Sequence, residues 1–241
     1  MSVHVFVDES RRGGTYLLAA AVVPPGRLDR LRCLVRNLLL PGERRIHFQA
    51  ENDSRRRKIL GEFVTHGARA QIYLGCGRPD RVRAVCLERL LDDVISWDTR
   101  RLVIESRGEA DATDRALIHR MLTRYESVRE RMSYEHLLPH DDPCLAIPDA
   151  VAWAYGAGSD WRRRVAPTVT EVVNLGVVAR PGKREARAPV VRRAYPGSLP
   201  LPSGEAAIDA TRAAGPANCS RTSRLEVHSV VGGVQFGLMR W

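Results

Sequence analysis

The chain has 241 residues, of which 44% are hydrophobic and 27% charged, and its 38 basic against 28 acidic side chains give a formal net charge of +10. This apolar content is enough for one sizeable core, which excludes a fibrous or wholly disordered polymer. Nearly all of the positive charge is arginine, because Lys58 and Lys183 are the only lysines. The arginine excess favours a nucleic-acid partner, since the guanidinium fork suits phosphate, although a GC-rich genome gives the same bias.

Cysteine usage and hydropathy indicate a reduced, cytoplasmic protein. The five cysteines are widely spaced and never form a C-x-x-C pair, which argues against a zinc site and a disulfide framework. The longest apolar run, residues 16–23, is far shorter than the roughly 20 residues that span a bilayer. It follows a mixture of acidic and basic residues, unlike a signal peptide, so we expect no membrane partner.

Composition divides the chain into two parts. Up to Thr170 there are 28 basic and 23 acidic residues, and the hydrophobic residues recur with clear periodicity. The last 71 residues contain 10 basic and 5 acidic residues and are rich in Pro, Gly, Ser and Arg. We expect an α/β domain over residues 1–172 and a basic tail over 173–241 that is mostly disordered or weakly structured. Within the tail, Leu225 to Leu238 is apolar enough for a strand pair.

Periodicity predicts alternating strands and helices in the first part. In chain order these are strand 3–8, a turn at 11–14, strand 15–23, helix 28–39, an extended segment 44–48 and helix 53–66 capped by Asp53 or Ser54. Strand 68–75, helix 80–97, strand 101–105, helix 111–131, strand 134–138 and helix 147–155 follow. This order predicts a mixed five-stranded sheet flanked by helices.

Three acids form the strongest candidate site. If the strands 3–8 and 101–105 are adjacent and parallel, Asp8 and Glu105 emerge side by side, and a helix on the sheet brings Asp149 between them. Converging carboxylates describe a magnesium site. Two such ions, roughly 3.5 to 4 Å apart, activate a water and stabilise the leaving oxygen of a phosphodiester. The alternative is that each acid caps a helix, pairs with an arginine or lies in solvent.

Four segments in order resemble a known bacterial family, domain of unknown function 3800. They are VHVFVDES, IHF with the arginine-rich helix after it, RLVIES and LAIPDAVAWAY. The resemblance covers roughly residues 3 to 170 and implies an RNase H-like fold. It assigns Asp8 to the first-strand acid, Glu105 to the fourth-strand acid and Asp149 to the helix acid. Glu9 and Ser10 complete the first motif, and His47 matches a histidine of the insert.

The sequence departs from that family at two places. Arg11 stands where members have a glycine, and Ile147-Pro148-Asp149 replaces the usual Leu-Ala-Asp helix start. The first change alters the turn, whereas the second keeps the carboxylate. The family's activity is itself inferred from its fold, so the resemblance supports an architecture better than a reaction.

Several other polar residues have competing interpretations. His47 is either an outer ligand or proton shuttle, or a histidine hydrogen-bonded beside the sheet. For Asp111 and Asp114, which open a helix, capping is favoured over metal binding.

A Pro-flanked group is expected to be a solvated loop; it comprises His136, His140, Asp141 and Asp142. A basic group either binds phosphate or forms solvated faces beside acids; it comprises Arg44, Arg45, Arg55, Arg56, Arg57 and Lys58, with Arg162 to Arg164 as a further run.

These observations favour one function over two others. The favoured function is a Mg²⁺- or Mn²⁺-dependent nuclease that cleaves RNA, DNA or a hybrid, with Asp8, Glu105 and Asp149 as metal ligands. Glu9 and His47 are expected to position groups or transfer protons. The alternatives are a non-catalytic nucleic-acid-binding module on the same fold, and a phosphatase or nucleotide hydrolase, which would not need the arginines.

Overall fold

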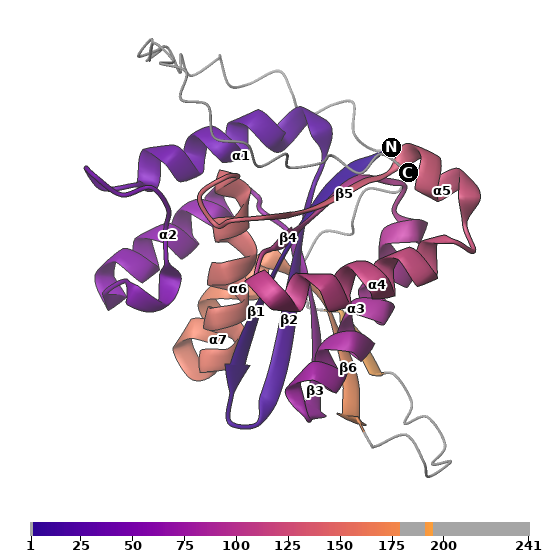
Figure 1. Cartoon of the computed structure of the whole chain (residues 1–241). Coiled ribbons are helices and arrows are strands. Elements are labelled where there is room, and N and C mark those ends of the chain that lie inside the picture. Colours follow the sequence, from indigo (N-terminus) through magenta and orange to yellow (C-terminus); the bar gives the residue numbers. More distant parts are fainter. Residues whose placement is uncertain (1, 179–190, 195–241) are drawn as a thin grey trace.

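The computed structural model describes residues 2–178 and 191–194, which form a mixed sheet with helices on both faces (Figure 1). The expected α/β class is therefore confirmed. Most of the expected tail, including the strand pair over Leu225 to Leu238, lies outside the described residues.

The sheet contains all five expected strands and two more. The strands are β1 Val3–Arg12, β2 Thr15–Val23, β3 Ala70–Gly77, β4 Thr99–Glu105, β5 Ser133–Leu137, β6 Val169–Val178 and β7 Val191–Ala194. Their order is β5-β4-β1-β2-β3-β6-β7, with β2 antiparallel to both neighbours and β1, β4 and β5 parallel. β6 pairs with β3 and crosses the expected boundary at residue 172, so the sheet extends into the segment assigned to the tail.

The helices follow the predicted order with local differences. They are α1 Pro25–Leu38, α2 Asp53–Thr65, α3 Pro79–Ser96, α4 Asp111–Leu122, α5 Glu126–Arg131, α6 Ala146–Ala157 and α7 Ser159–Val165. The single helix predicted over 111–131 is interrupted between α4 and α5, and α7 was not predicted. Residues 44–47 form no strand, and the short 3₁₀ helix η1 (Phe48–Ala50) follows them.

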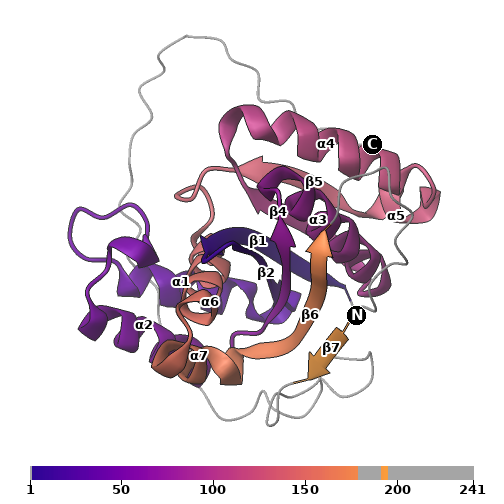
Figure 2. The ribbon, with the colours of Figure 1, turned by 90° about the horizontal axis from the view of Figure 1, so that it is seen from below.

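The two faces of the sheet bury separate cores, because successive strand residues point to opposite sides. On β1, Phe6 packs with α1, α2 and α6, whereas Val5 and Val7 pack with α3 and α4. Figure 2 shows these two helix layers on either side of the sheet. By the same alternation, Asp8 lies on the α6 face and Glu9 on the α3 face.

Asn52 caps α2, in place of the predicted Asp53 or Ser54. Its side-chain oxygen accepts a hydrogen bond from the Arg55 backbone N–H at 2.9 Å. Asn52→Ala is expected to lower the free energy of unfolding by about 1 kcal/mol, measured by urea denaturation, because the donor is left unpaired. Ser54→Ala, in the exposed first turn of α2, is the matched control. Equal losses for the two variants would contradict the capping assignment.

Candidate functional site

Strand register and helix packing bring the three predicted acids to one face. β1 and β4 run parallel with Val7 beside Ile104, so Asp8 follows next to Glu105, the last residue of β4. Helix α6 packs across β1, and Asp149 lies in its first turn. The three carboxylates therefore come from three separate elements of the fold.

A backbone contact fixes Asp149. Its Oδ2 atom accepts a hydrogen bond from the backbone N–H of Phe48 at 3.0 Å, which ties α6 to η1. Phe48 is fully buried and its ring meets that of Trp153 edge to face, with 5.3 Å between centroids. Asp149 is thus held by both its helix and the segment that carries His47.

The acid site has excess negative charge. Burial raises the pKa of Asp8 well above its ordinary value, and the charges of Glu105 and Asp149 raise it further. Burial and the charge of Asp149 raise the pKa of Glu105 to about 7. Burial also raises the pKa of Asp149, against the opposing effect of the Phe48 N–H. The negative charge of each acid is therefore less favourable here than on an isolated carboxyl group, and a bound cation would offset this.

The acids have few cationic partners. Among the described residues, none forms a hydrogen bond or ion pair with the Asp8 carboxylate, and Arg45 reaches Glu105 only at 3.9 Å. Carboxylate oxygens are hard ligands, and those without a cationic partner are suited to binding a divalent cation such as Mg²⁺ or Mn²⁺. In the described part of the chain, however, no three His, Cys, Asp or Glu side chains stand close enough to form a ready metal-binding set. A cation would have to draw these carboxylates together.

Exposed cationic residues lie before and along α2. His47 directly precedes Phe48, and its charge acts on Asp149, so it belongs to the surroundings of the acids. Arg45 lies beside Glu105, and Arg44 next to it is also exposed. On α2, Arg57 and Lys58 are exposed.

Two predicted phosphate contacts have structural partners instead. Arg55 is only 12% exposed and pairs with Glu43 and Glu51. Arg56, 14% exposed, donates to the carbonyls of Phe48 and Gln49. Arg55 and Arg56 therefore do not belong to an exposed basic surface.

Glu9 lies on the opposite face of β1 from the three acids. It pairs with Arg83 and with Arg107, the latter at 2.8 Å, and accepts a hydrogen bond from Tyr16. The expected catalytic role of Glu9 beside Asp8 is not supported by this placement. Sequence adjacency was misleading here because neighbouring strand residues alternate in direction.

A buried ion-pair network extends from Glu9. Arg83, 5% exposed, also pairs with Asp114, and Asp114 contacts His136 at 3.3 Å.

Asp111 accepts hydrogen bonds from the backbone N–H of Arg107 at 2.8 Å and from the Ser106 hydroxyl. Asp111 and Asp114 thus have structural partners away from the acid site, but neither side chain caps α4, whose N-cap residue is Ala110. The side chains of His136 and Asp142, which were expected in a solvated loop, are buried. Asp142 forms ion pairs with both Arg32 and Arg101.

The network predicts how Asp114 titrates. Hydrogen bonds from His136 and Arg83 outweigh burial and lower the pKa of Asp114 to about 2. Because its ordinary value is 3.8, the stability it contributes is present above about pH 4 and is lost as the pH falls toward 2. Carboxyl NMR titration of the folded protein, with Asp114→Asn to assign the resonance, is expected to give a midpoint near 2. A midpoint at or above 3.8 would contradict the network.

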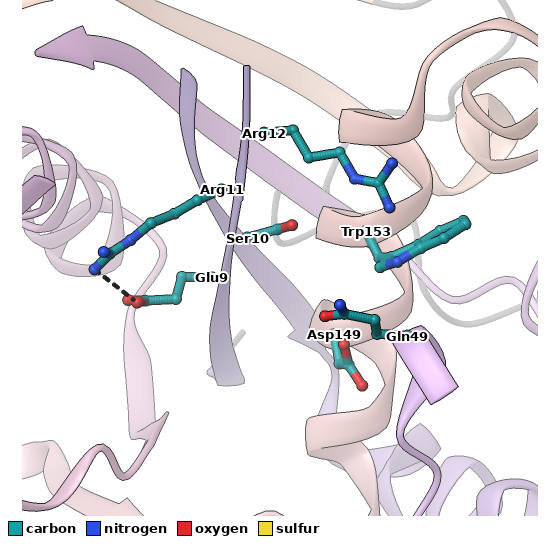
Figure 3. A pocket seen from close by; sticks show the side chains of 7 residues that line it. All are labelled: Glu9, Ser10, Arg11, Arg12, Gln49, Asp149 and Trp153. Carbon is teal, nitrogen blue, oxygen red and sulfur yellow. Dashed lines mark ion pairs between the residues drawn. The ribbon is translucent and has the colours of Figure 1, made fainter. Parts of the chain in front are cut away.

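A pocket of about 400 Å³ opens beside Asp149 (Figure 3). It lies along the segment of β1 beyond Asp8, which β4 does not pair because β4 ends at Glu105. Its lining residues are Glu9, Ser10, Arg11, Arg12, Gln49, Asp149 and Trp153. Sequence reasoning missed Arg12, Gln49 and Trp153 as site residues; the only available signal was that Trp153 lies one helical turn after Asp149.

Comparison with known proteins gives two distant likenesses. The sequence matches no protein-family model and no curated protein, so the resemblance to domain of unknown function 3800 has no family-model support. One similar solved structure is Bst-RNase HIII in complex with Mn²⁺, with 16% identity, a TM-score of 0.42 and coverage of 63% of this chain. This chain spans about half of it, 51%.

The second likeness is to a structure of the PCNA:RNase HII complex from Archaeoglobus fulgidus. It has 16% identity and a TM-score of 0.42, and the match covers 65% of this chain and 73% of the other. Separately, none of the helices in the described residues is long and apolar enough to cross a membrane.

Proposed function

We propose that this protein is a divalent-metal-dependent nuclease that hydrolyses phosphodiester bonds of RNA, DNA or a hybrid at Asp8, Glu105 and Asp149. The observation that carries this proposal is the excess negative charge of three carboxylates on one face of the sheet. Glu105 and Asp149 raise the pKa of Asp8, and Asp149 raises that of Glu105. A fold that needed these acids only for stability would pair them with its many arginines, as it pairs Glu9 and Asp114.

In this proposal each residue near the acids has a distinct task. Asp8, Glu105 and Asp149 would hold Mg²⁺ or Mn²⁺, which supplies Lewis acidity and lowers the pKa of water. The Phe48 N–H keeps Asp149 oriented. His47, which is exposed and precedes Phe48 in the chain, would transfer a proton to or from solvent. Arg44, Arg45, Arg57 and Lys58 remain the candidates for phosphate contact.

The pocket is suited to a strand of nucleic acid. Its lining is almost entirely polar or charged, and it runs past Asp149 along an unpaired strand edge. A small apolar substrate would find few contacts there. A phosphodiester backbone would bring the negative charge that the neighbouring arginines attract.

The test is a cleavage assay on labelled RNA, DNA and hybrid substrates, with Mg²⁺, Mn²⁺ or EDTA. Wild-type protein is expected to cleave at least one substrate only with metal, and Asp8→Asn to lose this cleavage. Salt-sensitive binding without cleavage of any substrate, unchanged in Asp8→Asn, would contradict the nuclease and support the non-catalytic binding module. The observation that favours the binding module is that no three metal-ligating side chains lie close enough together among the described residues.

A further inference from the structure

We infer that Arg12 is a substrate-positioning residue that binds a backbone phosphate of the same nucleic-acid strand that is held at the acids. The inference rests on the proposed function, in that it takes the substrate to be a nucleic-acid strand. It begins with the direction of the side chain. Arg12 is four residues after Asp8 on β1, so both side chains lie on the α6 face of the sheet.

The Arg12 side chain is held in place along its whole length. Its guanidinium carbon lies 4.6 Å from the centroid of the Trp153 ring. Its stem passes over Gly156, where an added Cβ would lie 3.6 Å from Arg12 Cδ. Trp153 is only 8% exposed and is itself fixed by Phe48, Trp161 and the guanidinium of Arg56, 4.2 Å from its ring. A side chain positioned in advance loses less entropy when it binds a ligand.

The hydrogen-bonding groups of Arg12 are nevertheless available. Arg12 is exposed, and among the described residues no acceptor forms a hydrogen bond or ion pair with its guanidinium. Arg56, on the same ring, donates instead to two backbone carbonyls and Asp53. A planar guanidinium that is fixed, exposed and without an acceptor is suited to bidentate contact with phosphate.

Arg12 lines the same pocket as Asp149. Trp153 follows Asp149 by four residues, about one turn or roughly 6 Å along the axis of α6. The Arg12 guanidinium lies over Trp153, and the Arg12 backbone is four strand residues, roughly 13 Å, beyond Asp8. Arg12, Trp153 and Asp149 are all part of the pocket lining (Figure 3). A strand in the pocket can therefore place one phosphate at the acids and another, farther along the same strand, at Arg12.

Arg120 is the matched control, because it has the same charge but does not line the pocket. Arg120 is 64% exposed on α4 and reaches Glu88 at 3.5 Å. Its charge therefore has an acidic partner, as does that of Arg11, which lines the pocket but points toward Glu9, 3.6 Å away (Figure 3). Arg120→Ala and Arg12→Ala change the net charge equally and differ in where the guanidinium is lost.

The experiment measures binding of labelled single-stranded RNA, single-stranded DNA and hybrid by the full chain, in EDTA, over a series of salt concentrations. Arg12→Ala is expected to weaken binding about tenfold and to lower the slope of log affinity against log salt by about 1. Arg12→Lys should keep the slope, and Arg120→Ala should leave both affinity and slope near wild type. Thermal unfolding verifies that all variants fold.

Two outcomes would overturn the inference: equal effects of Arg120→Ala and Arg12→Ala, or no binding by wild type. Parallel cleavage assays with Mg²⁺ and Mn²⁺ separate it from the proposed function. Wild-type cleavage with equal effects of the two alanine variants rejects the role of Arg12 and keeps the nuclease. Binding that depends on Arg12, without cleavage of any substrate, keeps the role of Arg12 and rejects the nuclease.

Discussion

Asp149→Asn is expected to abolish metal-dependent cleavage while making the metal-free protein more stable. Asparagine keeps a side-chain oxygen that can accept the Phe48 N–H, so the link between α6 and η1 survives. The variant removes a half-buried negative charge that raises the pKa of both Asp8 and Glu105. Cleavage should fall by about 10³-fold or more, which corresponds to roughly 4 kcal/mol of transition-state stabilisation. The free energy of unfolding at neutral pH in EDTA should rise by about 0.5–2 kcal/mol.

The opposite signs of these two effects make the prediction specific. A purely structural Asp149 would lose stability when its charge is removed, and activity would fall only with the fraction folded. Asp29→Asn is the control, because the Asp29 side chain is 99% exposed on α1. A destabilised Asp149→Asn that still cleaves at the wild-type rate would contradict the assignment of Asp149 to the site.

Arg83→Met is expected to cause the largest loss of stability of the variants considered. Arg83 is 5% exposed and lies between Glu9 and Asp114, so its removal leaves two buried carboxylates with fewer partners. Breaking such a pair from one side costs about 3–5 kcal/mol. Because Glu9 keeps Arg107 and Asp114 keeps His136, we expect about 3 kcal/mol, measured by urea unfolding.

A matched control and a second substitution sharpen this prediction. Arg120→Met removes an arginine that is 64% exposed and reaches Glu88 at 3.5 Å, and it should cost about 1 kcal/mol or less. Adding Asp114→Asn to Arg83→Met should recover part of the loss, since the unpaired charge is then gone. Similar losses for Arg83→Met and Arg120→Met would show that the network contributes little.

The parts of the fold with strong periodicity were predictable from the sequence. The apolar run over residues 15–23 ends at Pro24, and it forms β2 with those same bounds. The acid that ends RLVIE falls at the end of β4, beside Asp8, because parallel strands share a direction. Local pattern and strand order were therefore sufficient to bring Asp8, Glu105 and Asp149 to one face.

The rest depends on contacts that a sequence does not display. Arg55, Arg56 and Arg57 are consecutive, yet only Arg57 is exposed, because Glu43 and Glu51 approach Arg55 from the preceding segment. β6 was not predicted as a strand, and the predicted domain boundary at residue 172 falls inside it, because its pairing with the distant β3 is not visible in the sequence. Arg12 lies against Trp153 of α6, which is 141 positions later in the chain.

The most direct test of the acid site is calorimetric titration of the full chain with Mn²⁺ at neutral pH. Wild type and Asp29→Asn are expected to bind Mn²⁺ alike. Asp8→Asn is expected to weaken that binding at least tenfold, about 1.4 kcal/mol, because it removes a carboxylate with no ion-pair partner in the described residues. Equal Mn²⁺ affinity in wild type and Asp8→Asn would contradict a metal site at Asp8, Glu105 and Asp149.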